Sequence, residues 1–238
     1  MPSHTGDGYR YKHPFIIKKI IIKGRFMYEL NLNHGPLNYN YLDKIIKVID
    51  RAIAEHPRTF ALRFDLHLPD IQQNDIDGQY GVTGRNDAAV ISRFIDSLKA
   101  HIRADITRRN KNARVHPCTM RYVWVREFNP SSAIIEKWHY HVLILLNKDT
   151  YAYPGNYQDN NNLVSMIVDA WAGALGLNKG ECKNLVHIPE NPYYYLNSRE
   201  PITFQENREK LIYRISYMAK LKTKSTEDGC RSFGCSQR

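Results

Sequence analysis

The chain has 238 residues and a hydrophobic fraction of 42%, which is enough for one well-buried domain. Lys and Arg outnumber Asp and Glu by 34 to 24, so the formal net charge is +10, which favours a polyanionic partner such as nucleic acid or an anionic membrane surface. The apolar run at 15–24 is broken by two lysines, is too short to span a bilayer and precedes no cleavage signal, so it implies neither a membrane nor an export role. Four spread cysteines predict reduced thiols in the cytoplasm.

The hydrophobic pattern predicts alternating helices and strands in chain order. Residues 41–56 have helical spacing, and residues 58–69 alternate as a strand does. The later elements are a loop at 69–87, a helix at 88–109, strands at 118–128 and 138–147 joined as a hairpin, a helix at about 161–175 stopped by Gly176, a short strand at 184–188, a loop rich in Tyr and Pro, a helix at 206–221 and a Gly/Ser/Cys-rich tail. This order predicts a mixed α+β fold.

Two histidines lie one residue apart in the stretch KWHYHVLILLN at 137–147. Because alternate residues of a strand face the same side, His139 and His141 project together, and two imidazoles at that spacing can share one metal ion. Ten histidines in 238 residues give roughly 0.4 chance pairs of this kind, so the pair needs further ligands to support a metal site.

A carboxylate completes the candidate metal site. The preceding strand ends in VREF, and Glu127 lies at the far end of a hairpin from His139, where its carboxylate can complete a two-histidine, one-carboxylate set with open positions for substrate. Such a set accepts Mg or Mn when a phosphate supplies further oxygen atoms. The alternative for Glu127 is a surface salt bridge with a neighbouring arginine. Asp65 and His67, on the polar side of strand 58–69, are rival third ligands.

The stretch YRISYMAK at 213–220 carries a candidate nucleophile. On a helix Tyr213, Tyr217 and Lys220 lie at i, i+4 and i+7, within about 60° of one another and opposite an apolar stripe. A phenol is only about 0.3% ionised near pH 7.5, so a nucleophilic tyrosine needs a polarised phosphate and a nearby cation, which Lys220 can supply. The alternatives are that the tyrosines pack against the tail and that Lys220 is a lysine favoured by the helix dipole.

Basic and aromatic residues offer a surface for DNA. The aromatic candidates are Tyr193, Tyr194 and Tyr195, which can stack on unpaired bases. The basic candidates, which can neutralise phosphates, are Arg103, Arg108, Arg109, Lys111 and Arg114 at a helix end and loop, together with Arg63, Lys222, Lys224 and Arg231. The alternative is that these charges form an ordinary solvated face.

Two motifs resemble those of the HUH endonucleases, which are relaxases and rolling-circle replication initiators. They are H-Y-H on a strand and Y-x-x-x-Y-x-x-K on a late helix, as in enzymes with two tyrosines. In order along the chain, RFDLHLP, ISRFIDSLKAHI, RYVWVREF, HYHVLILLNKDTY, AWAGALGL, YRISYMAKLKTK and RSFGCSQR resemble the YagK/YfjJ C-terminal domain family, which includes inovirus-type replication proteins of phages and prophages. We therefore expect an HUH-like catalytic domain at 37–238 and an N-terminal extension or arm at 1–36.

The resemblance implies an antiparallel sheet with the histidines on a central strand, flanking helices, and a divalent ion held by His139, His141 and a third ligand. It also implies that Tyr217, followed by Lys220 in the Y-x-x-K pattern, attacks a DNA phosphodiester. The products are a 5′-phosphotyrosine and a 3′-OH that primes replication. Tyr213 occupies the upstream position of two-tyrosine enzymes.

The implied substrate is single-stranded DNA or an origin hairpin, and a host replication helicase and polymerase are the implied partners. Tyr140, between the two histidines, departs from the aliphatic residue that is more typical of the motif. A non-catalytic, sequence-specific DNA-binding regulator on the same fold is the alternative. The intact set of histidines, glutamate and Y-x-x-K favours the enzyme.

Overall fold

The computed structural model describes residues 19–22, 26–69, 85–129, 137–156, 159–222, 224 and 229–237. The strands are β1 (Lys19–Ile22), β2 (Phe26–Glu29), β3 (Arg58–His67), β4 (Arg121–Asn129), β5 (Lys137–Asn147), β6 (Val186–His187), β7 (Tyr193–Asn197) and β8 (Phe233–Cys235). The helices are α1 (Tyr39–Glu55), α2 (Val90–Asn110), α3 (Leu163–Leu175), α4 (Lys179–Cys182) and α5 (Pro201–Ser216), with 3-10 turns η2 (Lys183–Leu185) and η3 (Tyr217–Ala219). Most of the predicted loop at 69–87 lies outside the described residues.

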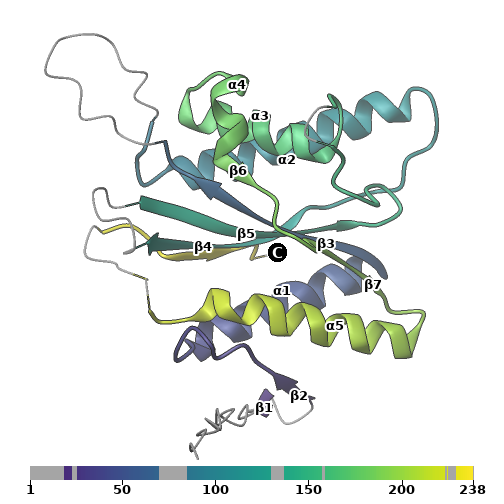
Figure 1. Cartoon of the computed structure of the whole chain (residues 1–238). Helices are drawn as coiled ribbons and strands as arrows, with labels where there is room; N and C mark the ends of the chain where they lie inside the picture. The colour runs from purple at the N-terminus through teal and green to yellow at the C-terminus, as the bar shows by residue number, and fades with distance from the viewer. Residues whose placement is uncertain are drawn as a thin grey trace, which may run out of the picture.

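An open antiparallel sheet forms the centre of the molecule (Figure 1). Its order is β6-β3-β5-β4-β8, and β7 pairs with β3 beside β6. All its pairings are antiparallel, and the predicted β4–β5 hairpin is present. The expected α+β class and the expected antiparallel sheet with flanking helices are therefore confirmed, and the histidine-bearing strand β5 lies between β3 and β4.

Helices cover both faces of the sheet (Figure 1). On one face α2 and α3 bury the aromatic and aliphatic side chains of the even-numbered positions of β3 and β5, including Phe60, Phe64 and Val142. On the other face α1 and α5 cover Leu143 and Leu145. Because strand residues alternate between faces, His139 and His141 share the α1/α5 face with these two leucines.

Local signals explain the helix ends that the sequence predicts correctly. The side chain of Asn38 accepts hydrogen bonds from the backbone N–H groups of Asn40 and Tyr41 at the start of α1. Asn162 and Ser165 form a capping box at the start of α3, and Gly176 ends that helix with φ of +72°, a left-handed conformation that glycine adopts without strain.

Two parts of the sequence prediction are wrong. The Tyr/Pro-rich loop contains a strand, β7, because Tyr193–Asn197 pairs with Arg58–Leu62 of β3. The helix expected at 206–221 begins earlier, with Pro201 in its first turn, and ends earlier, at Ser216. Tyr217 therefore lies in the 3-10 turn η3, and Lys220 lies beyond that turn with ψ of 144°, so the two do not continue one α-helix.

Residues just before α1 pack on the domain. Tyr28, Leu30 and Leu37 are buried in the core on the α1/α5 face, and the backbone N–H of Asn31 donates to the Ser216 hydroxyl at 2.9 Å. The N-terminal segment through residue 18 lies outside the described residues. None of the helices in the described part of the chain combines the length and apolar character that crossing a bilayer requires.

Candidate metal centre

Strand register brings the three predicted metal ligands together. His139 of β5 lies directly opposite Glu127 of β4, and His141 is two residues further along the same face of β5. One potential ligand atom of each residue lies within 4.8 Å of the others. The Nε2 atom of His141 is 3.2 Å from that of His139 and 3.3 Å from Oε2 of Glu127. A donor set of two imidazole nitrogens and one carboxylate fits Mn, Mg or another divalent ion of mixed nitrogen and oxygen preference.

Asp65 orients His141 from the neighbouring strand. It lies opposite His141 in the β3–β5 register, and Nδ1 of His141 donates to its Oδ1 at 2.5 Å. With Nδ1 engaged, Nε2 is the nitrogen that faces His139 and Glu127. Burial opposes a charged imidazole, but the hydrogen bonds to Asp65 and Glu127 outweigh it and raise the pKa of His141.

His139 is suited to bind a cation as a neutral ligand. Burial lowers its pKa to about 4, and the neighbouring charge of His141 adds to this effect. The ring therefore keeps a free lone pair near pH 7, which metal ligation requires. His67, the rival ligand opposite it on β3, stacks on His139 with ring centroids 5.8 Å apart. His67 therefore supports the ring of His139 from the side.

Glu127 is buried and surrounded by cations. Its side chain is 1% exposed, and it contacts Nζ of Lys220 at 2.7 Å and Nζ of Lys224 at 3.1 Å. Burial alone would raise the pKa of Glu127, but the hydrogen bond with His141 and the two lysines lower it to about 2. Glu127 is therefore an anion near pH 7, and it is buried with two lysines among its partners rather than lying on the surface.

Tyr217 lies beside the histidines, and its hydroxyl is held by an arginine. Nε of Arg63 donates to the Tyr217 oxygen at 2.7 Å, while Nη2 of Arg63 contacts both carboxylate oxygens of Asp65 at 2.9 and 3.1 Å. The rings of Tyr217 and His141 are 5.2 Å apart at an interplanar angle of 77°. Burial raises the pKa of Tyr217 well above its ordinary value, and the charge of Arg63 offsets this only in part.

The other two residues of the tyrosine motif make different contacts. Lys220 is engaged with Glu127, and its Nζ is 5.7 Å from the centre of the Tyr217 ring. Tyr213, one turn earlier on α5, is 37% exposed, and no hydrogen bond within the described residues joins its side chain to the metal group. Tyr217 is thus the tyrosine that the fold brings to the metal ligands.

The candidate DNA-binding residues fall into three places. Arg63 and Lys224 belong to the candidate metal centre itself. Lys222 is exposed just after η3, and Arg231 lies over the Trp124 ring at 5.9 Å. The remaining candidates lie on the second half of α2 and the loop that follows it, and they are Arg103, Arg108, Arg109, Lys111 and Arg114.

Sequence patterns alone did not assign Arg63 to the tyrosine or Asp65 to His141. The available signal was strand alternation, because Arg63 and Asp65 occupy the same face of β3 as His67. Which residues of β5 they contact depends on the register of β3 against β5, which the sequence does not give. The resulting arrangement is an electron-pair-donor set for a divalent ion beside a phenol and an arginine, which is suited to chemistry on a phosphodiester.

The fold and the site together define an α+β protein with a candidate divalent-metal site on the central strand of an antiparallel sheet. The model of the YagK/YfjJ C-terminal domain matches residues 23–236, and the chain belongs to this family. It is 37% identical over 206 residues to the uncharacterized protein YagK of Escherichia coli (strain K12), which covers 86% of this chain and 95% of YagK. It is 38% identical over 201 residues to the uncharacterized protein YfjJ of the same strain, covering 83% and 93%. No solved structure matches the chain at a significant level.

Proposed function

We propose that the chain is a metal-dependent, HUH-type endonuclease that nicks single-stranded DNA through a 5′-phosphotyrosine intermediate and initiates rolling-circle replication of a phage, prophage or related mobile element. The observation that carries the proposal is the meeting of Glu127, His139 and His141 within 4.8 Å, with the Tyr217 ring 5.2 Å from His141. These are the residue types, in one place, that phosphodiester transfer to a tyrosine requires.

The reaction is a transesterification that balances without a further reactant. The Tyr217 oxygen bonds to phosphorus and the bond from phosphorus to the 3′ oxygen breaks. The phenol loses its proton, the departing 3′ oxygen gains one, and the phosphate stays on the 5′ side of the strand. One phosphodiester replaces another, so the energy of the cleaved bond is kept for rejoining. A free 3′-OH is the end that a host polymerase extends.

The charges around Tyr217 explain how a buried phenol can take part. Its raised pKa keeps the hydroxyl neutral without DNA, and Arg63 holds the oxygen in place at 2.7 Å. A divalent ion, when bound, supplies positive charge that polarises the scissile phosphate. Arg63 lies where it can also stabilise the charge that develops on the phosphate oxygens, since guanidinium groups bind phosphate in two-point contacts.

Tyr213 has a separate proposed role. It is exposed and one helical turn from Tyr217, so it is placed for a second transfer that ends a replication round rather than for the first attack.

The test is covalent capture of DNA on the protein. We expect the wild-type chain with Mn²⁺ and a randomised pool of single-stranded DNA to form an adduct that survives denaturation, and sequencing of the captured strands to reveal a preferred site. Tyr217→Phe removes only the hydroxyl and should eliminate the adduct, and His139→Ala/His141→Ala should do the same.

Tyr213→Phe is the matched control, because it removes a hydroxyl from the same segment and should leave the first adduct intact. An adduct mapped to Tyr213, or a full yield from Tyr217→Phe, would contradict the assignment. DNA binding without an adduct for any divalent ion would favour the sequence-specific regulator instead.

A further inference from the structure

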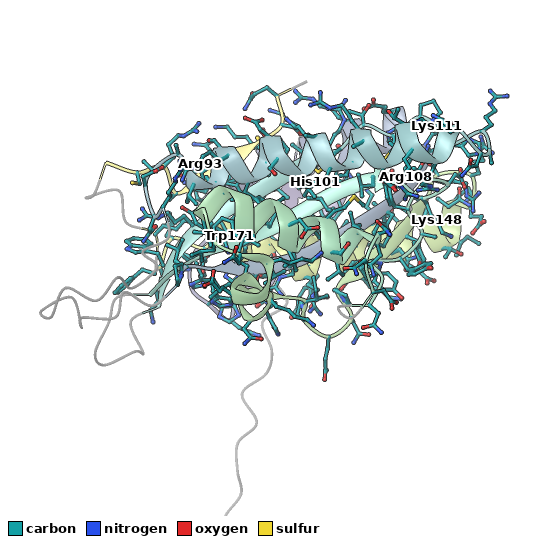
Figure 2. All side chains as sticks on the ribbon, turned by 90° about the horizontal axis from the view of Figure 1, so that it is seen from above. Arg93, His101, Arg108, Lys111, Lys148 and Trp171 are labelled. Atoms are coloured by element: carbon teal, nitrogen blue, oxygen red, sulfur yellow. The ribbon has the colours of Figure 1, made fainter. Side chains whose placement is uncertain are left out.

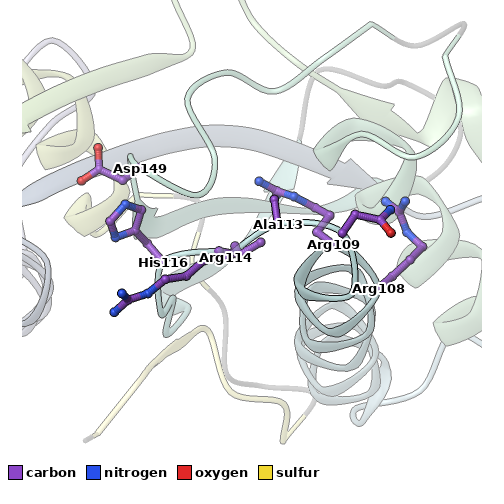
Figure 3. A pocket seen from close by; sticks show the side chains of 8 residues that line it. Arg108, Arg109, Ala113, Arg114, His116 and Asp149 are labelled. Carbon is purple, nitrogen blue, oxygen red and sulfur yellow. The ribbon is translucent and has the colours of Figure 1, made fainter.

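A cationic pocket lies at the end of α2, apart from the candidate metal centre (Figure 3). It has a volume of about 280 Å³, its charged lining residues are Arg108, Arg109, Arg114 and Asp149, and His116 also lines it. Arg109 donates to the carbonyl oxygen of Thr150 at 3.1 Å, so the pocket lies just beyond the C-terminal end of β5. The eight-residue step from His139 to Asn147 along β5 corresponds to roughly 26 Å at about 3.3 Å per residue, which separates the two sites.

A buried carboxylate holds two of the arginines in place. Asp105, whose side chain is 10% exposed, contacts Nη2 of Arg108 at 2.6 Å and Nη1 of Arg109 at 3.4 Å. The Tyr151 hydroxyl donates to the same carboxylate at 2.8 Å, and the Arg109 guanidinium lies 5.5 Å from the Tyr151 ring centre. Because these guanidinium groups are already oriented, a ligand orders fewer side chains when it binds.

The loop after α2 carries the third arginine on a turn that a hydrogen bond closes. The side chain of Asn110 accepts a hydrogen bond from the backbone N–H of Val115 at 2.7 Å, which closes the turn around Arg114. Arg114 is exposed, and no contact within the described residues engages its side chain. Asp149, the one carboxylate of the lining, is paired with Arg58. The pocket therefore presents uncompensated positive charge, which calls for an anion.

Aromatic side chains lie around Lys148, the chain neighbour of the lining residue Asp149. Nζ of Lys148, the residue before Asp149, lies 4.2 Å from the centre of the Tyr195 ring, and the rings of Tyr193 and Tyr195 are 5.4 Å apart. Tyr193 is 38% exposed and Tyr153 is 69% exposed. Arg108, Lys111 and Lys148 lie at the same end of the molecule (Figure 2). Phosphate-binding guanidinium groups beside exposed rings suit single-stranded nucleic acid, whose backbone is anionic and whose bases can stack.

We propose that this pocket and the neighbouring tyrosines bind single-stranded DNA, with a backbone phosphate in the pocket and unpaired bases on Tyr153 and Tyr193. This is a second DNA contact at the opposite end of β5 from the candidate metal centre. The choice of DNA over RNA rests on the proposed function, whereas the phosphate site rests on the pocket itself. The second contact holds the strand while the first site cuts it.

The test is the salt dependence of binding to a fluorescent 20-nucleotide oligothymidine, measured by anisotropy in EDTA so that no cleavage occurs. Arg108→Gln/Arg114→Gln removes two phosphate contacts and should lower the slope of log affinity against log salt by about 1.4 for a single strand. The matched control is Lys47→Gln/Arg51→Gln, which removes two charges from the outer part of α1 and should leave the slope unchanged. Equal losses in the two proteins, or no loss in either, would overturn the proposal.

The tyrosines are tested separately. Tyr153→Ala/Tyr193→Ala should weaken binding of the oligothymidine at least about 25-fold, since each of the two stacked bases contributes about fivefold or more. Binding of a duplex of equal length should stay unchanged. Tyr153→Ala alone, at a residue 69% exposed, shows the effect without risk to folding. An unchanged affinity, or tighter binding of oligouridine than of oligothymidine, would overturn the assignment to DNA.

Adduct formation by the wild-type chain separates this proposal from the nickase. If the salt slope depends on the pocket but no adduct forms, the second DNA contact is supported and the nickase proposal is contradicted. If an adduct forms but the slope does not change in Arg108→Gln/Arg114→Gln, the nickase proposal is supported and the second DNA contact is contradicted.

Discussion

Arg63 is the cation that donates a hydrogen bond to the Tyr217 hydroxyl. The spacing Y-x-x-K suggests a lysine one turn from the tyrosine, but Lys220 pairs with Glu127 at 2.7 Å while Nε of Arg63 reaches the phenol oxygen at 2.7 Å. Helical spacing measures neighbours along one element, whereas Arg63 comes from β3. The spacing of a motif therefore does not report a cation that reaches the tyrosine from another element, and the roles of Tyr217 and Lys220 stay predictions.

Asp65 orients His141, and replacing Asp65 tests whether this orientation matters for metal binding. Asp65→Asn keeps the shape of the side chain but removes the charge that holds the Nδ1 proton of His141. We expect Mn²⁺ affinity to fall by about 10- to 100-fold, as is typical when a carboxylate behind a histidine ligand is lost. Isothermal titration with Mn²⁺ measures the change.

Asp149→Asn is the control for this experiment, because Asp149 also pairs with an arginine but lies beyond the far end of β5. Its Mn²⁺ affinity should match that of the wild type. A wild-type affinity for Asp65→Asn would mean that His141 is oriented without the carboxylate, and that Asp65 serves Arg63 alone.

At the scale of elements, strands with strict alternation and helices with clear caps were predictable. The β3 and β5 strands and the hairpin register of Glu127 with His139 follow from alternation and a short connection. The strand β7 was missed because Tyr193, Tyr194 and Tyr195 show no alternation of polar and apolar residues. Tyrosine nevertheless favours strands, so the signal was present in the composition of the segment.

The end of α5 depends on a contact that the local sequence does not contain. Lys220 forms an isolated bridge with Leu37, and the backbone N–H of Asn38 donates to the Ala219 carbonyl at 2.7 Å. These bonds draw the chain out of the helix after η3 and direct Lys220 toward Glu127. The end of the helix therefore depends on contacts between residues about 180 positions apart in sequence. The hydrophobic periodicity within 206–221 contains no information about such contacts.

The short strand β8 packs its glycine directly on an indole. A Cβ atom at Gly234 would lie 2.4 Å from the Trp124 ring, and such an approach forces the strand or the ring to move. Gly234→Ala should therefore destabilise the protein by about 1–3 kcal/mol. Urea unfolding at neutral pH measures this loss.

Gly173→Ala is the control, and we expect it to change the free energy of unfolding in the opposite direction. Gly173 lies within α3, and a Cβ there meets nothing within 4 Å, so alanine should stabilise the protein by about 0.5–1 kcal/mol through helix propensity. If Gly234→Ala were as stable as Gly173→Ala, the close packing of β8 on Trp124 would not contribute to the fold.

At the scale of the whole molecule, the sheet separates an apolar core on the α2/α3 face from a second core on the α1/α5 face that opens into the candidate metal centre. The sequence predicted that Glu127, His139 and His141 lie together, because each sits in a local pattern. It could not predict Asp65 and Arg63 in their roles, since these depend on the β3–β5 register. The net charge of +10 indicated a polyanionic partner but not that cations gather at both ends of β5.

The proposed binding of a divalent ion predicts a link between the candidate metal centre and the stability of the whole fold. An ion that binds the folded chain alone stabilises it by about 2.7 kcal/mol at 100 times its dissociation constant. For a chain of this size each kcal/mol raises Tm by about 2–4 °C, so Mn²⁺ at that level should raise Tm by roughly 5–11 °C relative to EDTA. His139→Ala/His141→Ala should abolish the shift, because it removes two of the three ligands. Tyr217→Phe should keep it, because the phenol is not among them. Differential scanning calorimetry measures all three proteins without DNA, and an equal shift in the double-alanine variant would place Mn²⁺ elsewhere on the molecule.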